Sequence, residues 1–324
     1  MSSQDNASAL ADVAVPMVIG VTSHRDIPED EGGILRESVR DFFARLQREY
    51  PFSPLWVLSP LAEGGDQLVA EEGLKLGARL VAPLPFAREL YAQDFTDPAA
   101  RERFESLCAQ AQVIELPLLD GHTPDTVSIP GEARNRQYAQ AGMFVARHCH
   151  LLLAIWDGKP FAGLGGTAQI VDYFLTGTPP GDMTHRRNPR LRLYGGGDER
   201  LLCHLVCSRD KQGGTPAAPL QPGQVVWRSS DGASVPDAPM PAALRTVFAR
   251  MDGFNAEAAK YAGEIGARRG ILDDCAIVAR RPVPCRRLAG HPLPAARVAG
   301  NAGDLSGRVR DGRDVHGVRQ LVYA

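Results

Sequence analysis

Short apolar runs alternate with amphipathic segments through the first 175 residues. The apolar runs predict strands at Met17–Val21, Leu55–Leu58, Leu80–Leu84, Val113–Leu116 and Leu151–Trp156. Apolar residues at helical spacing predict helices at Ile34–Tyr50, Gly64–Gly77, Pro98–Gln110, Ala133–His148 and Gly165–Leu175. Strands without polar alternation are typical of burial on both faces, and strands separated by helices pair in parallel. The pattern therefore predicts an α/β fold around a doubly wound, mainly parallel Rossmann-like sheet.

The pattern weakens after residue 175, where Gly, Pro and Arg become frequent. Leu201–Cys207 and Gln224–Trp227 are consistent with two further strands, whereas Gly213–Gly223 and Ser229–Pro241 are loop-like. An amphipathic helix follows, with its apolar positions at Leu244, Val247, Phe248, Met251, Ala258, Tyr261 and Ile265. We therefore expect a disordered N-terminus at 1–15, a main domain at 16–210, an irregular α/β extension of loop and helix at 211–275, and a tail at 276–324.

The tail differs in charge from the rest of the chain. Residues 280–324 contain nine Arg and three Asp and no Lys or Glu, a net charge of +6 in a chain of −2. One interpretation is a disordered basic tail. The other is a slip of the reading frame near Asp274–Pro284, so that the natural protein continues differently and has lost, for example, a membrane segment. Translation of the other two frames tests the second interpretation.

Composition limits the cellular compartments and the classes of binding partner that are expected. A net charge of −2 argues against bulk binding to nucleic acid, so no double-stranded nucleic acid is expected as a partner. The polar start Met1–Asp12 predicts no signal peptide, and no apolar stretch of about eighteen residues predicts a membrane span. Six cysteines in a chain this long indicate a reducing, cytoplasmic compartment rather than a disulfide framework.

The cysteines are expected to be buried and inert, and no metal is expected. The alternative is a zinc site built from Cys203, Cys207, His148, Cys149 and His150. The CxxC pairs typical of structural zinc sites are absent.

Ligands of doubly wound sheets bind beyond the carboxyl ends of the strands, so the loops there are the candidate site. The turn Gly163–Thr167 follows a predicted strand and opens a helix. Gly165 and Gly166 would let the backbone approach a phosphate, where the helix N-terminus offers free N–H groups, and Thr167 would add a hydroxyl or cap the helix. The alternative is a tight strand-to-helix turn without a ligand.

The start of the preceding helix adds cationic groups. Arg134 and Arg136 are suited to phosphate because the guanidinium fork is planar and bidentate, and Asn135 could bind a base or ribose. The alternative for these residues is a solvated helix start. Asp157, directly after a predicted strand, is a further candidate ligand-binding residue.

Two more loops lie at the same predicted edge. In the turn that begins at Ser59, Gly64 and Gly65 would allow ligand contact or serve turn geometry, and Glu63 and Asp66 would accept from ribose hydroxyls or cap the helix.

The loop after the first strand contributes Gly20, Thr22, His24 and Arg25, of which the last two would bind anionic groups unless the loop is merely polar. Neither a P-loop nor the GxGxxG fingerprint is present.

Taken together, these segments resemble the SLOG superfamily, which includes DNA-uptake processing proteins, "lonely guy" phosphoribohydrolases and nucleotide-sensing domains of bacterial conflict systems. The resemblance rests on IGVTSHRD, SPLAEGGDQLVAEEGLKLGA, RNRQYAQAGMFVARHCHLLLAIWDG and GLGGTAQIV, and covers about residues 16–175. It implies a Rossmann-like domain that binds a nucleotide or nucleotide-derived ligand in the loops named above, with no cofactor required.

Whether the resemblance implies ligand binding or catalysis depends on which branch of that superfamily the chain resembles. Phosphoribohydrolases resembling "lonely guy" carry PGGxGTxxE, whereas this turn is GLGGT with Ile170 where the acid would stand and the amide Gln169 beside it. An amide cannot serve as a general base, and it cannot stabilise an oxocarbenium ion as a carboxylate does. We therefore expect a ligand sensor of a bacterial signalling or defence system, with homo-oligomerisation left open. The alternatives are an N-glycosidic hydrolase using Glu63 or Asp66, and then a single-stranded DNA-binding protein.

Overall fold

The structure is a computed structural model that describes residues 14–160, 163–183, 200–211, 214–230, 234–236 and 245–260. The chain divides into one unit at Met1–Gly266 and another at Ala267–Ala324, and all described residues belong to the first. The predicted tail at 276–324, its suggested frame slip and most of the predicted N-terminal segment lie outside the described residues. Within the described part of the chain, no helix is long and apolar enough to cross a membrane.

The described strands form one sheet in the order β4-β3-β2-β1-β5-β6-β7-β8. Their bounds are β1 Met17–Ser23, β2 Leu55–Leu58, β3 Arg79–Leu84, β4 Gln112–Glu115, β5 Leu151–Trp156, β6 Leu201–Val206, β7 Val225–Ser229 and β8 Ser234–Pro236. Strands β1 to β6 pair in parallel, with Ile19 opposite Val57 and Val21 opposite Leu153, and β7 and β8 pair antiparallel at one edge. This order confirms the predicted α/β fold with a doubly wound, mainly parallel sheet.

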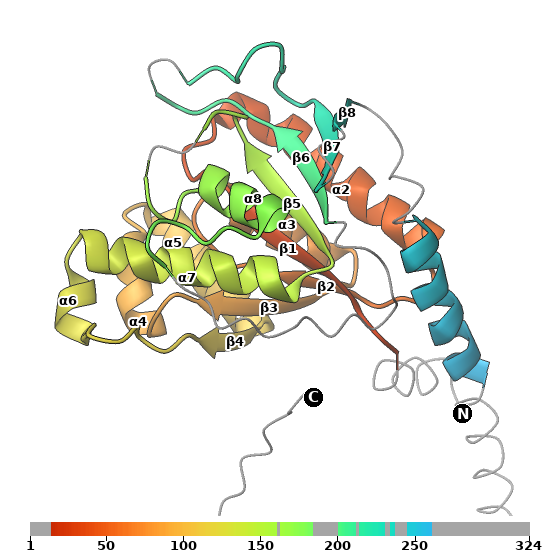
Figure 1. Cartoon of the computed structure of the whole chain (residues 1–324), viewed down its shortest axis with the longest axis horizontal. Coiled ribbons are helices and arrows are strands. Elements are labelled where there is room, and N and C mark those ends of the chain that lie inside the picture. Colours follow the sequence, from red (N-terminus) through yellow and green to blue (C-terminus); the bar gives the residue numbers. More distant parts are fainter. Residues whose placement is uncertain are drawn as a thin grey trace, which may run out of the picture. The chain divides into compact units, whose positions relative to one another are not determined.

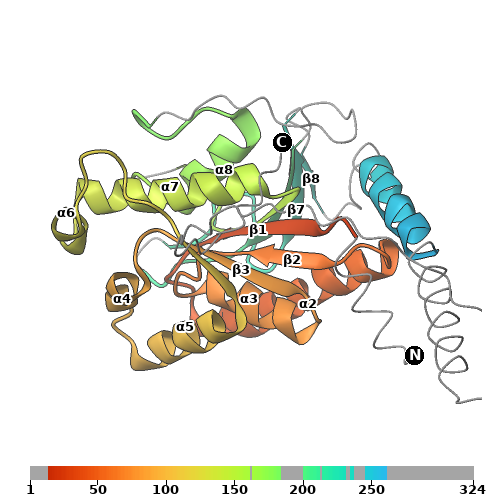
Figure 2. The same ribbon diagram turned by 90° about the horizontal axis from the view of Figure 1, so that it is seen from below.

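Helices cover both faces of the sheet. Their bounds are α2 Gly32–Glu49, α3 Gly65–Lys75, α4 Arg88–Tyr91, α5 Pro98–Gln110, α6 Pro124–Ser128, α7 Glu132–His148 and α8 Thr167–Thr176, with 3-10 turns η1 Glu29–Glu31 and η2 Ala92–Asp94. Figure 2 shows α7 and α8 on one face and α2, α3 and α5 on the other, and Figure 1 looks onto the α7–α8 side. Right-handed crossovers between parallel strands produce this arrangement.

Besides the two 3-10 turns, one short strand and two short helices were not expected from the sequence. The segment Ser229–Pro241 is predicted to be a loop, but β8 lies inside it. The loop prediction is therefore wrong at Ser234–Pro236. The helices α4 and α6, of four and five residues, also fall between predicted elements. Elements this short do not show a hydrophobic period of their own, because their hydrogen bonds and packing come from neighbouring segments.

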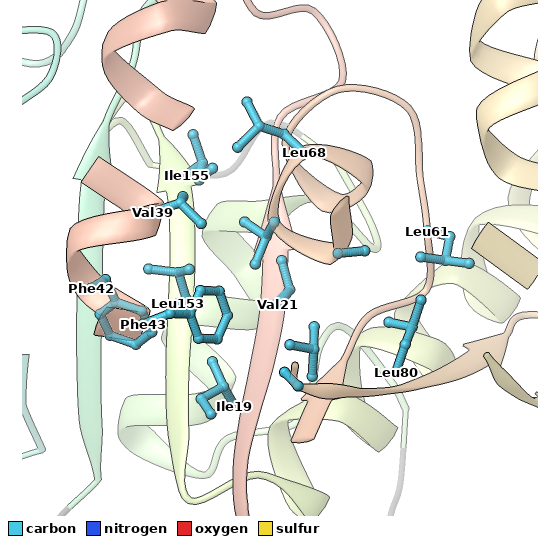
Figure 3. Close-up of a cluster of buried hydrophobic side chains, with 14 of the residues drawn as sticks. Ile19, Val21, Val39, Phe42, Phe43, Leu61, Leu68, Leu80, Leu153 and Ile155 are labelled. Atoms are coloured by element: carbon cyan, nitrogen blue, oxygen red, sulfur yellow. The ribbon is translucent and has the colours of Figure 1, made fainter. Parts of the chain in front are cut away.

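The core lies on both sides of the central strands. Figure 3 shows Ile19, Val21, Leu153 and Ile155 of β1 and β5 facing Phe43 of α2. On the other face, buried residues of β5 and β6 pack against α7 and α8, among them Leu152, Ala154, Met143, Ile170 and Phe174. All six residues of β5 are buried, which confirms the burial on both faces expected from its unbroken apolar sequence.

Close packing of α7 and α8 sets the position of the α8 N-terminus. A Cβ atom on Gly142 of α7 would lie 2.4 Å from Cδ1 of Ile170 in α8. Only a residue without a side chain lets the two helices approach so closely. α8 is thereby held with its first turn at the carboxyl edge of the sheet.

The sheet continues beyond residue 210, where the main domain was expected to end. β7 pairs with β6, and Trp227 of β7 stacks on Phe42 of α2 with ring centroids 6.1 Å apart. Residues 245–260 are helical, as expected, and Phe248 packs edge-on against Tyr50 at 5.8 Å. β7 and this helix therefore pack against the same body as β1 to β6.

Candidate functional site

A cavity of about 580 Å³ opens at the carboxyl edge of β1 and β5. The chain leaves β1 toward β2 on one side, and the later strands β5 and β6 lie on the other side, so the strand order reverses here. Crevices at such a switch point are where open α/β sheets bind ligands. The cavity walls come from the loops after β1, β2, β3, β5 and β6, from α3, α4 and α7, and from the turn that opens α8.

The end of β1 and the loop that follows it line the cavity and are attached to two helix starts. Thr22, Ser23, His24 and Arg25 all line the cavity. Ser23 Oγ donates a hydrogen bond of 2.6 Å to Asp66 Oδ1 at the start of α3. Thr167 Oγ1, at the start of α8, donates one of 2.7 Å to the Ser23 carbonyl. Both contacts hold the loop at the edge of the sheet.

The turn before α3 approaches the β1 loop closely. Gly64 has a φ of +83°, and a Cβ there would lie 2.5 Å from the Arg25 carbonyl oxygen. A Cβ on Gly65 would lie 2.6 Å from Cβ of Ser23. Neither glycine lines the cavity, and Glu63 does not line it either. The space at Gly64 is filled by the backbone of His24 and Arg25, and the space at Gly65 by the side chains of Ser23 and Ile155.

Asp66 is one of two buried carboxyl groups that line the cavity. It lines the wall and is 2 % exposed. Burial raises the pKa of Asp66 to about 7, although hydrogen bonds from Ser23 and the Ala62 amide and the charge of Arg25 oppose the rise. Ser59 is buried beneath it, where its hydroxyl donates to the Asp66 carbonyl at 3.3 Å. Asp66 can therefore gain or lose a proton near neutral pH.

A histidine and a carboxylate face each other across the end of β5. Nε2 of His24 lies 3.1 Å from Oδ1 of Asp157, and both residues line the cavity. Burial lowers the pKa of His24, against the raising effect of Asp157. For Asp157 burial alone would raise the pKa, but hydrogen bonds from His24 and the Lys159 amide lower it. The two carboxyl groups therefore differ, because the pKa of Asp157 is lowered whereas Asp66 can be protonated near neutral pH.

The glycine turn packs against α7 and opens α8 at the cavity. Gly165 has a φ of +82°, and a Cβ there would lie 2.9 Å from the Asn135 carbonyl oxygen. The Gly165 amide donates to Oε1 of Gln169 at 2.7 Å. Gln169 thus shapes the turn from within α8. Gly165, Gly166 and Thr167 line the cavity, and no side chain caps α8 within the described residues.

The start of α7 lies outside the cavity lining. Arg134 is buried, where it donates to the carboxylate of Asp94, the Val127 carbonyl and the Tyr138 hydroxyl. Arg136 pairs with Asp182 at 2.6 Å, and the side chain of Asn135 is exposed. The sequence could not show the partner of Arg134, because Asp94 lies forty residues away in a turn with no predictable element.

Gly20 also lies outside the lining. A Cβ there would be 2.7 Å from Sγ of Cys149, so Gly20 provides close packing of β1 against the residue after α7.

Cys203 and Cys207 are buried, and burial raises the pKa of both thiols. Among the described residues no group of His, Cys, Asp and Glu could hold a metal ion.

Several lining residues were not singled out from the sequence. Lys159 follows β5, and Arg209 and Lys211 follow β6. Tyr91 of α4 and Tyr138 of α7 complete the opposite wall. The predicted strand at Leu201–Cys207 could have indicated Arg209 and Lys211. A further parallel strand brings the loop at its carboxyl end to the same edge of the sheet.

No family model matches the sequence, and no curated protein matches it. Among solved structures, the chain is similar to DNA processing protein A (DprA) from Streptococcus pneumoniae, with 16% identity and a TM-score of 0.28. The match covers 45% of this chain and 42% of that chain, so this chain spans less than half of that protein's length. A likeness this partial carries no argument about function, and the Rossmann-like fold rests on the strand order itself.

Proposed function

We propose that the cavity binds an anionic nucleotide or nucleotide-derived ligand and that the protein acts as a sensor of it. The observation that carries the proposal is the combination of an uncapped helix start with a cationic wall at the switch point. Arg25, Lys159, Arg209 and Lys211 line the same cavity as the turn Gly163–Thr167. Backbone amides, a helix N-terminus and cations together favour phosphate.

The phosphate group would lie at the first turn of α8. Gly165 and Gly166 have no side chains that would keep an oxygen from the backbone. Thr167 donates its hydroxyl proton to Ser23, so its role in this proposal is to hold the β1 loop in place. The uncharged part of the ligand would lie against Pro60, Ala62 and Tyr138, on the wall beside Asp66.

Titration calorimetry and thermal shift with AMP, ATP, NAD and ADP-ribose test the proposal. The informative variant is Arg25→Gln, because that side chain is 42% exposed and lines the cavity. We expect about tenfold weaker binding of the best ligand, the effect of losing one hydrogen bond to a charged group. The matched control is Arg48→Gln, an exposed residue of α2 outside the cavity lining, which should bind as the wild type does. Equal affinities of the two variants, or no ligand at all, would refute the proposal.

A second function, hydrolysis of an N-glycosidic bond, is favoured by the environment of Asp66. A carboxyl group with a pKa of about 7 can hold a proton at neutral pH and give it to a departing base. Water would bond to the sugar carbon as its bond to the base nitrogen breaks, the base would take the Asp66 proton, and the water proton would restore the carboxyl group. Glu63 is the weaker choice because it does not line the cavity.

Chromatography for free base separates the two functions. If the protein is a hydrolase, wild type and Glu63→Gln release base, and Asp66→Asn does not. If the protein is a sensor, wild type binds a nucleotide and releases no base. Equal release by wild type and Asp66→Asn would remove Asp66 from the reaction.

A further inference from the structure

The loop after β6 is bonded to the segment that follows β1. The Asp210 amide donates to the Asp26 carbonyl at 2.7 Å. The Ser208 amide donates to Oε2 of Glu31, also at 2.7 Å. Both donors belong to the backbone of the loop, so these bonds hold the loop at the carboxyl edge of the sheet independently of its own side chains.

The side chain of Arg209, in the same loop, is bonded to Asp26 as well. Its Nε donates to both carboxylate oxygens of Asp26, at 2.9 and 3.1 Å. A guanidinium has five N–H donors, of which Nε carries one. In the described part of the chain, the two terminal amino groups of Arg209 have no partner. The bond to Asp26 therefore leaves the forked end of the guanidinium available to a ligand.

The guanidinium of Arg209 lies on the cavity side of Asp26. Arg209 lines the cavity, whereas Asp26 does not. Burial is the main cause that lowers the pKa of His24, and Asp157 raises it. The charge of Arg209 lowers this pKa further and outweighs the opposite effect of Asp26. Because His24 lines the cavity, the charge of Arg209 acts on groups inside it more strongly than the charge of Asp26 does.

We propose that Asp26 is a positioning residue of the cavity and that the terminal amino groups of Arg209, which it orients, bind a phosphate of the ligand. The proposal rests on the proposed nucleotide binding and adds the residue that orients one of its cations. Two phosphate oxygens match the two terminal amino groups of one guanidinium. Since Asp26 already holds Arg209, less side-chain freedom is lost when the ligand binds.

Positioning by Asp26 and the charge of Asp26 change the affinity in opposite directions. The carboxylate is negative, so removal of its charge alone should strengthen the binding of an anion nearby. Removal of the bond to Nε leaves Arg209 free to adopt many rotamers, which should weaken binding. The direction of the change therefore distinguishes a positioning residue from a mere neighbouring charge.

Titration calorimetry on the full chain tests the proposal with AMP, ATP, NAD and ADP-ribose as probes. With the probe that the wild type binds most tightly, Asp26→Ala should bind roughly fivefold more weakly, the cost of ordering one long side chain. Asp26→Asn keeps one oxygen that can accept from Nε, so its affinity should lie between the two. The matched control is Asp30→Ala, which removes the same charge from an exposed residue of η1 and should not weaken binding.

A double-mutant cycle with Arg209→Gln shows whether Asp26 acts through Arg209. Arg209→Gln alone should bind about tenfold more weakly, the effect of losing charge-assisted hydrogen bonds. Adding Asp26→Ala to Arg209→Gln should cause no further loss, because the side chain that Asp26 orients is then absent. A further loss of the same size as in the wild type would mean that Asp26 supports the loop in general, and would overturn the proposal.

The remaining outcomes separate this proposal from nucleotide binding itself. If no nucleotide binds to the wild type, nucleotide binding fails and the role of Asp26 fails with it. If a nucleotide binds, and Asp26→Ala binds it as tightly as the wild type or more tightly, the role of Asp26 alone is overturned. The same holds if Asp30→Ala weakens binding as much as Asp26→Ala does, or if Arg209→Gln binds as the wild type does.

Discussion

Asp66 and Asp157 are two buried carboxyl groups of one cavity in opposite electrostatic settings. For Asp66 burial prevails and the pKa rises to about 7. For Asp157 the hydrogen bonds from His24 and the Lys159 amide prevail over burial and lower the pKa. Near neutral pH the cavity therefore contains one ionised and one protonatable carboxyl group. Such separation of two pKa values by environment is what acid–base chemistry or pH-dependent binding requires.

The first prediction concerns the pH dependence of stability. The folded-state pKa of Asp66 lies above its ordinary value of 3.8, so its favourable contribution is fully present below pH 3.8 and is lost as the pH rises toward about 7. Asp66→Asn removes the ionisation and can still accept from Ser23. Melting temperatures from pH 4 to pH 8 should therefore fall less with rising pH in the variant than in the wild type. Parallel curves for the two proteins would contradict the assigned ionisation.

The second prediction concerns Gly65. A Cβ there would lie 2.6 Å from Cβ and 2.8 Å from Oγ of Ser23, so Gly65→Ala must displace the β1 loop. We expect a loss of about 2 kcal/mol in the free energy of unfolding, typical of overpacking, and weaker ligand binding. In the matched control Gly33→Ala of α2, the new Cβ would meet nothing within 4 Å. That variant should be as stable as the wild type or up to about 1 kcal/mol more stable. Urea unfolding that gives both variants equal stability would refute the close approach.

Between elements, a buried carboxylate joins α2 to α3. Glu72 of α3 is 0% exposed and accepts from Arg36 at 2.9 Å, Arg40 at 2.8 Å and Lys75 at 2.8 Å. Burial alone would raise the pKa of Glu72, but these hydrogen bonds lower it to about 2. Two of the three cations belong to α2, so the contact holds α3, the helix that carries Asp66, against α2.

The third prediction follows from this contact. The pKa of Glu72 is depressed below its ordinary value of 4.5, so its contribution is present above pH 4.5 and is lost as the pH falls toward about 2. Glu72→Gln should lower the free energy of unfolding at pH 7 by about 2 kcal/mol, a value reduced for the solvent exposure of the three cations. The difference from the wild type should shrink at pH 3. The control Glu49→Gln, which removes a partly exposed pair with Arg45, should cost less than about 0.5 kcal/mol. Equal losses for Glu72→Gln and Glu49→Gln in denaturant titrations would contradict the special role of Glu72.

At the scale of the whole described unit, the cavity and the late helix at residues 245–260 lie at opposite edges of the sheet. Asn255, in the helix at residues 245–260, is 0% exposed. It accepts from the Val15 amide at 2.8 Å and donates to the Val15 carbonyl at 2.9 Å, just before β1 begins. Asp252 of the same helix accepts from the Ser53 hydroxyl at 2.9 Å, just before β2 begins. The late helix therefore closes the amino edge, whereas the cavity lies at the carboxyl edge.

The fourth prediction separates stability from binding. Asn255→Ala leaves the Val15 amide and carbonyl without this partner and should lower the free energy of unfolding by about 2 kcal/mol. Nucleotide affinity should stay at the wild-type value, because the cavity draws no residue from this helix. Gly253→Ala in the same helix, where a Cβ would meet nothing within 4 Å, should not destabilise the protein. Calorimetry that finds a large loss of affinity in Asn255→Ala would show that the two edges are coupled.

Local patterns were enough to predict the longer elements of the first 175 residues and their order along the chain. Leu55–Leu58, Pro98–Gln110 and Leu151–Trp156 have the predicted bounds, because each is defined by its own apolar period and its own stop signals. Their alternation in turn determines a parallel sheet with candidate loops at the carboxyl edge. Of the predicted site, Thr22, His24, Arg25, Asp66 and Asp157 line the cavity together with the glycine turn.

Only the tertiary structure decided which of those side chains line the cavity. Arg134 pairs with Asp94 forty residues earlier, and Gly65 makes room for Ser23 rather than for a ligand. Arg209 and Lys211 reach the cavity because β6 lies beside β5. Such pairings depend on the packing of distant segments, whereas the period of a strand or helix depends on its own neighbouring residues. The sequence therefore determined the sheet and the edge at which the cavity opens, and the packing of helices on that sheet decided its lining.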